Sequence, residues 1–458
     1  MEEPAASSEM PLFPGQLSIW QDVFVNPQGA TAYNIGAYWE FIGPMDPSQF
    51  VEAIYQVVNA TPALRLEVIS HENGTPPRQR IRAPLPQQSA VSMDVSSELN
   101  PPGAARTWML QDVRSAFDLT AFPLFRVAIL KLAADWHYGY FVVHHLIVDG
   151  VGFSILLRDL ADALGSIAAG VVTAPTSAAE EDLRTYVAAV NAYDQSDEHE
   201  AARRYWLNLH ATPAPRVSLS MRDRQPVSAA EAIRVSFALP HVDTAALGAI
   251  ARGLDISLTE ILVAGVILFI HRMTGAEDIP IGLPVHGRPP ALRNRLVWMC
   301  MNVLPLRFAV APDLSLREFF HSVVAQFREA LRFQSYRYEA LRRDLGRLTG
   351  PGLFAISMNI IRGAGTVSRE RRGSVHRNFY SLSTGPVEDL AILITDGVDS
   401  ARDGGSSALL VELRANPATY ARPEIESLAD SFARLLNAVG SSGLGGAGEV
   451  PAEERQAS

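Results

Sequence analysis

FVVHHLIVDG, residues 141–150, joins a predicted strand to a predicted helix. The runs 124–132 (LFRVAILKL) and 137–143 (HYGYFVV) are apolar and rich in β-branched and aromatic residues, which predicts two adjacent strands. In the run 151–164 (VGFSILLRDLADAL), apolar residues recur at helical spacing. Gly150 permits a tight turn between them, because glycine lacks a Cβ atom. The stretch therefore predicts a strand, a turn and a helix in that order.

The polar residues of this stretch stand where the strand ends and the helix begins. His144 and His145 close the strand, and Asp149 precedes the helix. An imidazole here can take or give a proton near neutral pH. A carboxylate can fix the loop or the ring's tautomer, and the helix N-terminus can stabilise developing negative charge.

Two plainer interpretations compete with an active site. A single histidine with apolar neighbours is more often an ordinary core residue, but the combined pattern HHxxxDG is more specific and favours catalysis. Two histidines and an aspartate can also bind a metal ion. No further ligand follows at a matching spacing, so no metal site is predicted.

The composition is that of an ordinary globular protein. Of its 458 residues 48% are hydrophobic, so each of two or three domains can bury a core. Lys and Arg number 39 against 49 Asp and Glu, and the net charge of −10 argues against a nucleic-acid or anionic-lipid partner. The single cysteine, Cys300, excludes a disulfide framework, a cysteine zinc site and an iron–sulfur cluster.

No membrane-spanning or secretory segment is predicted. Residues 1–10 are acidic and lack the basic start and apolar core of a signal peptide. The longest apolar stretch, 258–270, carries Glu260 and is shorter than the ~20 residues that a bilayer span needs, so it predicts a buried helix. We expect a cytoplasmic protein with no membrane partner.

Two lobes of similar content are expected between poorly ordered tails. Residues 1–10 and 441–458 are small and polar. The stretch 165–181, rich in Ala, Gly, Ser and Thr, predicts a linker between the lobes 11–175 and 176–440. Each lobe mixes helices with strands, which predicts an α+β class in which helices cover a sheet, an α/β sandwich.

Further elements are predicted from periodicity and capping. Asp46 opens a helix that extends to residue 60, with proline in its first turn. In the second lobe we predict helices near 198–209, 244–252, 257–273, 316–345 and 423–439, and strands near 279–285, 302–310, 391–395 and 408–413.

HHLIVDG resembles the HHxxxDG core of the condensation domains of nonribosomal peptide synthetases. Other segments are similar to family motifs in the same order: 11–20 (PLFPGQLSIW), 61–65 (TPALR), 117–126 (FDLTAFPLFR), 281–288 (IGLPVHGR), 302–307 (NVLPLR), 336–345 (YRYEALRRDL) and 383–390 (STGPVEDL). The resemblance extends from about residue 11 to residue 440.

The resemblance implies a fold and a set of roles. The fold would be two chloramphenicol-acetyltransferase-like lobes in a V-shaped pseudodimer with a central tunnel. His145 would be the catalytic histidine, as general base or by orienting the nucleophile, and His144 would support it. Asp149 would be structural, paired with Arg288, and Gly150 would leave room beside the thioester.

Further site residues follow from the same resemblance. Asn302 is expected to be structural at the site. Residues 302–307, 336–345 and 383–390 look most like domains that take aryl or unusual β-amino acyl donors. The chain departs from that group at 298–301 (WMCM) and 355–357 (AIS), which should lie near the tunnel. Expected substrate-binding residues are therefore Trp298, Met301, Ser357 and Ser383.

The expected function is a condensation reaction. An aminoacyl or aryl group on the phosphopantetheine thioester of a carrier protein would pass to an amine or hydroxyl, giving an amide or an ester. The acceptor would be a small molecule or would be held by a second carrier. No nucleophilic serine or cysteine is placed by the motif, which favours direct transfer. We expect a freestanding monomeric enzyme with no bound cofactor, although excision from a larger synthetase is an alternative.

Other members of the superfamily provide the competing hypotheses. A catalytically silent docking module would usually lose the motif, which is intact here. A coenzyme A-dependent acyltransferase fits the length, but the plant-type DFGWG signature is absent. The segments 285–290 and 302–307 look like condensation rather than epimerisation, and the paired aspartates of heterocyclisation domains are missing.

Overall fold

The chain folds into two compact units, and neither is one stretch of sequence. The first comprises Met1–Ser196, His286–Met301 and Val367–Pro386, and the second comprises Asp197–Val285, Asn302–Thr366 and Val387–Ser458. The predicted lobes 11–175 and 176–440 differ from this division, because two later segments belong to the first unit. The structure is a computed structural model that describes residues 9–43, 46–70, 75–85, 91–170, 178–220, 232–311, 313–347, 350–361, 376–382, 385, 387–396 and 409–441.

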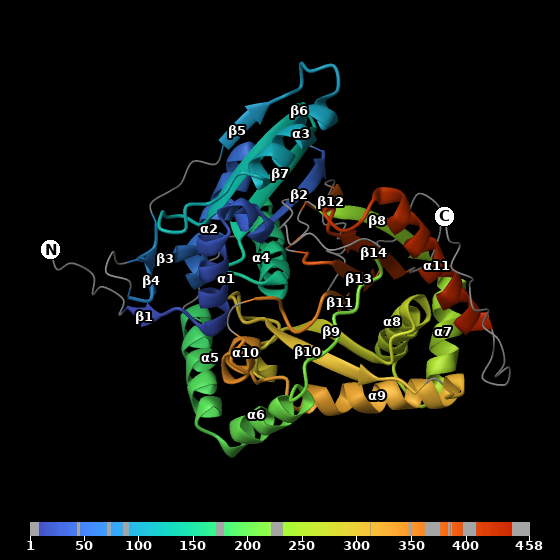
Figure 1. The fold of residues 1–458 in the computed structure, drawn as a ribbon. Coiled ribbons are helices and arrows are strands. Elements are labelled where there is room, and N and C mark those ends of the chain that lie inside the picture. Colours follow the sequence, from blue (N-terminus) through green and yellow to red (C-terminus); the bar gives the residue numbers. More distant parts are fainter. Residues whose placement is uncertain are drawn as a thin grey trace. The chain divides into compact units, whose positions relative to one another are not determined.

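The first unit is built on a mixed sheet whose described strands lie in the order β12-β2-β7-β6-β5 (Figure 1). β5 is parallel to β6, and the other neighbours are antiparallel. The helices and strands of the whole first unit are β1 (Met10–Pro11), α1 (Pro14–Val25), β2 (Asn34–Ile42), α2 (Pro47–Ala60), β3 (Leu66–Ile69), β4 (Arg78–Ile81), β5 (Val91–Asp94), α3 (Pro101–Val113), β6 (Phe125–Ala133), β7 (Trp136–His144), α4 (Gly150–Ala168), α5 (Ala178–Asp194) and β12 (His376–Ser381), with short 3-10 turns at Pro27–Tyr33, Pro62–Arg65 and Pro290–Leu292.

β7 is buried on both faces. Phe141 and Val143 belong to the core that the sheet forms with α2 and α4, whereas Tyr140 and Val142 belong to the core that it forms with α3. Successive side chains of a strand point to opposite faces. A strand that is covered on both sides therefore has an unbroken apolar sequence, which explains why the predicted strand ends only at the histidines.

β12 is contributed from far along the chain. Its residues His376–Ser381 pair antiparallel with β2, so that Ser381 lies opposite Ala37. The pairing continues beyond the strand, where the Leu382 N–H donates a 2.8 Å hydrogen bond to the Gly36 carbonyl. The first unit's sheet is therefore completed by residues that follow most of the second unit in sequence.

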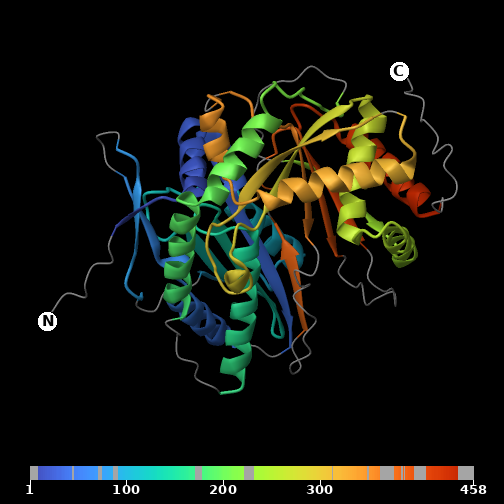
Figure 2. The same cartoon turned by 90° about the horizontal axis from the view of Figure 1, so that it is seen from below.

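The second unit contains a sheet in the order β10-β9-β11-β13-β14-β8, with α8, α9 and α11 against it (Figures 1 and 2). β11 is parallel to both its neighbours, and the other pairs are antiparallel. The elements are α6 (Asp197–Leu209), β8 (Ile233–Leu239), α7 (His241–Gly253), α8 (Leu258–Thr274), β9 (Asp278–Val285), β10 (Asn302–Ala309), α9 (Leu316–Arg332), α10 (Tyr338–Asp344), β11 (Ile356–Ile361), β13 (Leu390–Asp396), β14 (Leu409–Ala415) and α11 (Arg422–Ser441).

The predicted α+β class is confirmed, and the predicted strands and most predicted helices are present. The single helix predicted over 316–345 is wrong, because the chain leaves the helix at Phe333 and resumes it as α10. The predicted linker 165–181 is helical at both ends, where α4 extends to Ala168 and α5 begins at Ala178. The predicted tails lie outside the described residues except for Glu9, Met10 and Ser441.

α8 is the buried helix that its apolar sequence predicts. The Ser257 hydroxyl accepts from the Glu260 N–H, and the Glu260 carboxylate accepts from the Ser257 N–H, so the helix begins with a capping box. Among the described helices none is by itself long and apolar enough to cross a bilayer. α7 and α8 pass that test only as a pair, and the pair is bent by 100°.

The last helix closes the core of the second unit, which predicts a large loss of stability from its central aromatic residue. Phe432 of α11 is fully buried, and its ring centroid lies 4.8 Å from that of Phe269 in α8. We expect Phe432→Ala to lower the free energy of unfolding by about 3–5 kcal/mol, whereas Asn437→Ala on the exposed face of α11 should change it by less than about 0.5 kcal/mol. Urea unfolding followed by circular dichroism measures both, and equal losses would contradict this packing.

Candidate active site

The two motif histidines stand at the end of β7, next to β2. His144 is the last residue of the strand and pairs with Asn34. The Asn34 amide donates hydrogen bonds to the carbonyls of Val113 and Ser115, which ties the start of β2 to the end of α3. The His145 N–H donates a 2.7 Å hydrogen bond to the Tyr33 carbonyl. Both imidazoles are therefore anchored through the backbone of a rigid sheet.

His144 is a buried, neutral imidazole. It is 1% exposed, and its ring lies between Tyr33 and Phe117, with ring centroids 6.1 and 5.9 Å away. Burial, with a smaller contribution from the neighbouring His145, lowers the pKa of His144 to about 3. The His144 Nδ1 accepts a hydrogen bond of 3.2 Å from the Leu146 N–H, so the neutral ring carries its proton on Nε2. These contacts suit a supporting role.

His145 is held neutral by the same cause. Burial lowers its pKa, and the negative charge of Asp149 opposes that shift. Its Nδ1 is buried and makes no hydrogen bond to another of the described residues. A neutral imidazole keeps one basic nitrogen near neutral pH, so His145 can accept a proton or a hydrogen bond there.

Asp149 is the most heavily hydrogen-bonded side chain of the motif. It is 1% exposed and caps α4, where its Oδ1 accepts from the Gly152 N–H at 2.8 Å. Its Oδ2 accepts from the N–H groups of Cys300 and Met301 at 3.0 and 2.9 Å. The carboxylate therefore joins the start of α4 to a segment about 150 residues later in the chain.

Arg288 completes this arrangement, as the resemblance predicts. Its Nη1 and Nη2 donate to the two oxygens of Asp149, each at 2.8 Å, and both side chains are almost fully buried. The remaining guanidinium N–H groups donate to the carbonyls of Leu296, Trp298 and His286. Every charge and donor of this buried pair is thus compensated, which a buried ion pair requires. We call Asp149 and Arg288 the buried clamp.

The two glycines of the motif have different roles. A Cβ atom at Gly152 would lie 2.7 Å from Val148 and 3.1 Å from the Arg288 guanidinium, so only glycine fits beside the buried clamp. Gly150 begins α4 without a positive φ, and a Cβ there would meet nothing within 4 Å, so its predicted role of leaving room beside the thioester stays a prediction. The sequence VDGVG contained a sign that Gly152 has a structural role. Glycine disfavours a helix, so a second glycine at the start of α4 indicates that something other than helix propensity requires it.

A buried amide pair supports the loop after His145. Gln16 of α1 is fully buried and donates to the Leu146 carbonyl at 3.1 Å and to the Gln79 amide at 3.0 Å. The Gln16 oxygen also accepts from the Phe13 N–H, which begins α1. The segment 11–20 carries this residue, but nothing in its spacing indicated a contact with Leu146.

The predicted substrate residues Trp298 and Met301 contribute to the first unit in another way. Trp298 is fully buried, its ring packs edge-on against that of Phe13, and its carbonyl accepts from Arg288 and from the Asp149 N–H. Met301 is half-buried, and its N–H binds Asp149. Their observed contacts are packing and backbone contacts around the buried clamp, and their contact with substrate stays a prediction.

Two other predicted residues lie in the second unit. Asn302 is buried at the start of β10, and its amide donates to the carbonyls of Gln334 and Tyr336 at 2.9 and 2.8 Å. Its oxygen accepts from the Tyr338 N–H, so it holds the loop that separates α9 from α10. Ser357 is half-buried in β11, opposite Gly282 of β9. Ser383 lies outside the described residues.

Within the described part of the chain, no group of three or more His, Cys, Asp or Glu side chains is placed to hold a metal ion.

The condensation-domain family model matches residues 6–450. The chain belongs to the condensation domain family. This condensation domain is 32% identical over 424 residues to a dimodular nonribosomal peptide synthase of Bacillus subtilis (strain 168), covering 92% of this chain and 17% of the relative. It is 31% identical over 439 residues to an isonitrile lipopeptide synthase of Streptomyces coeruleorubidus, covering 93% of this chain and 28% of that relative. The domain thus spans less than a third of the length of these two relatives.

Solved structures are similar over nearly the whole domain. The first condensation domain of the calcium-dependent antibiotic synthetase, in complex with a substrate analogue, has a TM-score of 0.81 at 27% identity and covers 97% of this chain and 98% of its own. A starter condensation domain of rhizomide synthetase, in complex with C8-CoA, has a TM-score of 0.80 at 27% identity and covers 94% and 95%. Condensation domains catalyse amide bond formation, which is an acyl transfer.

The contrast between the two glycines predicts that replacement by alanine destabilises the protein at one position and not at the other. Gly152→Ala should lower the free energy of unfolding by about 1–3 kcal/mol, because the added methyl group forces Val148 and Arg288 apart. Gly150→Ala should leave it unchanged to within about 1 kcal/mol, since its Cβ would meet open space. Thermal or urea unfolding of both variants checks this; a greater loss for Gly150→Ala would contradict the observed geometry.

The buried clamp predicts strong coupling between its two charges. Asp149→Asn keeps a helix-capping oxygen but removes the charge, and Arg288→Met removes the opposite charge. Each single change should cost about 3–5 kcal/mol, because it leaves the other charge buried and unpaired. The double variant should cost clearly less than the sum of the two, and a double-mutant cycle from denaturant unfolding measures the difference. Additive losses would show that the two residues act independently.

Proposed function

We propose that this condensation domain transfers an aminoacyl or aryl group from the phosphopantetheine thioester of a carrier protein to an amine or hydroxyl acceptor, forming an amide or an ester. The observation that carries the proposal is His145. It is a neutral, buried imidazole with no other described residue bound to Nδ1, at the end of a rigid strand and next to the N-terminus of α4. The family and its intact HHxxxDG motif support the same reaction.

The chemistry needs little more than this arrangement. The acceptor nitrogen or oxygen donates a hydrogen bond to the neutral His145 ring and attacks the thioester carbonyl. The new C–N or C–O bond forms, the C–S bond breaks, and the acceptor's proton passes through the imidazole to the leaving thiolate. A thioester has a good leaving group, so positioning the acceptor and stabilising the transient oxyanion are the main tasks.

The other motif residues act on His145 indirectly. His144 holds the turn through its bond from the Leu146 N–H. The buried clamp holds α4 in place, so that the helix N-terminus stays beside the motif. In this proposal Asp149 and Arg288 are positioning residues rather than proton carriers, because their oxygens and N–H groups are already occupied.

A second candidate differs only in the donor. The starter condensation domain of rhizomide synthetase was solved in complex with C8-CoA, and coenzyme A carries its acyl group on the same phosphopantetheine arm as a carrier protein. A coenzyme A thioester is therefore the alternative donor. A silent docking module is less well supported, since His144, His145 and Asp149 are all present.

The role of His145 predicts a loss of activity without a loss of structure. His145→Ala should reduce acyl transfer by about 100- to 10,000-fold, whereas His241→Ala, at the exposed start of α7, should leave it unchanged. In the wild type the rate should be constant above about pH 7 and fall as acid protonates His145, at a pH below the ordinary histidine value of about 6.5, because burial lowers this pKa.

The decisive experiment offers each donor form to the same enzyme. Aryl and β-aminoacyl groups are presented on a phosphopantetheinylated carrier and as coenzyme A thioesters, with amine and alcohol acceptors. Mass spectrometry of the carrier and of the product measures transfer. Carrier-dependent transfer that requires His145 supports the proposal, and transfer from coenzyme A alone supports the second candidate. Unchanged transfer in folded His145→Ala would overturn the catalytic role.

A further inference from the structure

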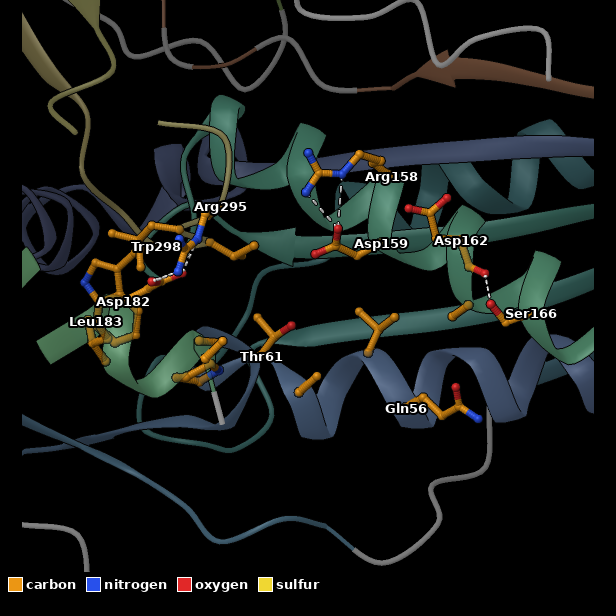
Figure 3. Close-up of a pocket in the computed structure, with 18 residues that line it drawn as sticks. Gln56, Thr61, Arg158, Asp159, Asp162, Ser166, Asp182, Leu183, Arg295 and Trp298 are labelled. Carbon is orange, nitrogen blue, oxygen red and sulfur yellow. Dashed lines mark hydrogen bonds and ion pairs between the residues drawn. The ribbon is translucent and has the colours of Figure 1, made fainter. Parts of the chain in front are cut away.

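A pocket of about 530 Å³ lies within the first unit (Figure 3). This volume falls in the range of pockets that hold small organic ligands, roughly 300–1,000 Å³. Its walls come from α2, α4, the first turns of α5 and the segment 295–298. His144, His145 and Asp149 do not line it, so it is separate from the proposed site of acyl transfer.

One wall of the pocket is apolar and firmly packed. Leu183 of α5 and the consecutive residues Leu296, Val297 and Trp298 are all buried in the core and line the pocket. Val57 of α2 adds another apolar side chain from the opposite helix. Such a wall can cover the hydrocarbon part of a ligand and release the water that it would otherwise order.

The polar residues of the pocket are unevenly paired. Arg158 donates to Asp159, and Arg295 donates to both carboxylate oxygens of Asp182, as the dashed lines in Figure 3 show. Asp162 also lines the pocket and forms no ion pair with any residue that the structure describes. Three carboxylates thus face two guanidinium groups, and the exposed Asp162 is the one without a cationic partner among the described residues.

The unpaired charge also affects its neighbour. Asp159 and Asp162 lie three residues apart on α4, and residues at this spacing are adjacent on a helix. Burial raises the pKa of Asp159, Arg158 opposes the rise, and the negative charge of Asp162 adds to it. A positive group placed beside these two carboxylates would relieve that repulsion.

We propose that this pocket binds an amphiphilic organic cation, a primary amine or guanidine with an apolar body, whose charged head pairs with Asp162. The head would form charge-assisted hydrogen bonds with Asp162, and the apolar body would lie along Val57, Leu183 and Val297. A neutral molecule would leave Asp162 unpaired, and an anion would add to the negative charge. The negative charge of Asp162 and the apolar wall of the pocket therefore both favour an amphiphilic cation.

The pocket shares a segment of chain with the buried clamp. Leu296 and Trp298 are among the residues that line the pocket, and their carbonyls accept hydrogen bonds from Arg288 at 3.0 and 2.8 Å. A ligand against these side chains therefore rests on the residues that hold Asp149. A small molecule bound in this pocket can therefore affect the first unit without reaching His145.

Calorimetric titration with 2-phenylethylamine tests the proposal, with 2-phenylethanol as the neutral analogue of the same shape. We expect the amine to bind at least about tenfold more tightly than the alcohol. Asp162→Asn should abolish that preference, because it removes the unpaired charge and keeps the shape. Asp194→Asn, at the exposed end of α5 and outside the pocket, should leave it unchanged.

Two further variants separate this pocket from other binding places. Ala163→Leu adds bulk to a residue of α4 that lines the pocket, so it should block binding of both probes. His145→Ala should bind the amine as the wild type does, which distinguishes this pocket from an acceptor site at the motif. Equal affinity for amine and alcohol, unchanged preference in Asp162→Asn, or no heat of binding in the folded wild type would each overturn the proposal.

Discussion

The carboxylate of Asp149 is the point on which the first unit depends. It accepts hydrogen bonds from the Arg288 guanidinium and from the N–H groups of Gly152, Cys300 and Met301. A buried charge is costly unless it is fully paired, and these bonds come from α4 and from the segment His286–Met301. One side chain thus both begins the helix after the motif and brings a later part of the chain into the first unit.

The position and the charge state of the histidines follow from how the sheet is covered. Because α2 and α4 cover one face of β7 and α3 covers the other, His144 at the end of the strand lies in an apolar interior. Burial favours the neutral imidazole for His144 and for His145. The packing that stabilises the sheet therefore also keeps both imidazoles neutral, and each neutral ring has one nitrogen that can accept a proton or a hydrogen bond near neutral pH.

The segment 295–301 connects three features of the first unit. Its residues 295–298 line the pocket between α2, α4 and α5, two of its carbonyls accept from Arg288, and its last two N–H groups bind Asp149. Trp298 shows how this changes the interpretation of a residue. The resemblance predicts that it lies near the substrate, which stays a prediction, and the structure adds that its indole is in the core and its carbonyl at the buried clamp.

Local patterns in the sequence were enough to predict the strand that carries the histidines, the helix that Asp149 caps and the α+β class, because each depends on neighbours within a few residues. The resemblance to condensation domains, rather than the local pattern, singled out His145 as the candidate catalytic residue. Periodicity could not show that 316–345 is interrupted, since the loop after α9 is held by Asn302 of β10. It could not show that β12 completes the first sheet, or that a Cβ atom at Gly152 would meet Val148 and Arg288. These features arise from contacts between residues far apart in the chain, which only the folded structure brings together.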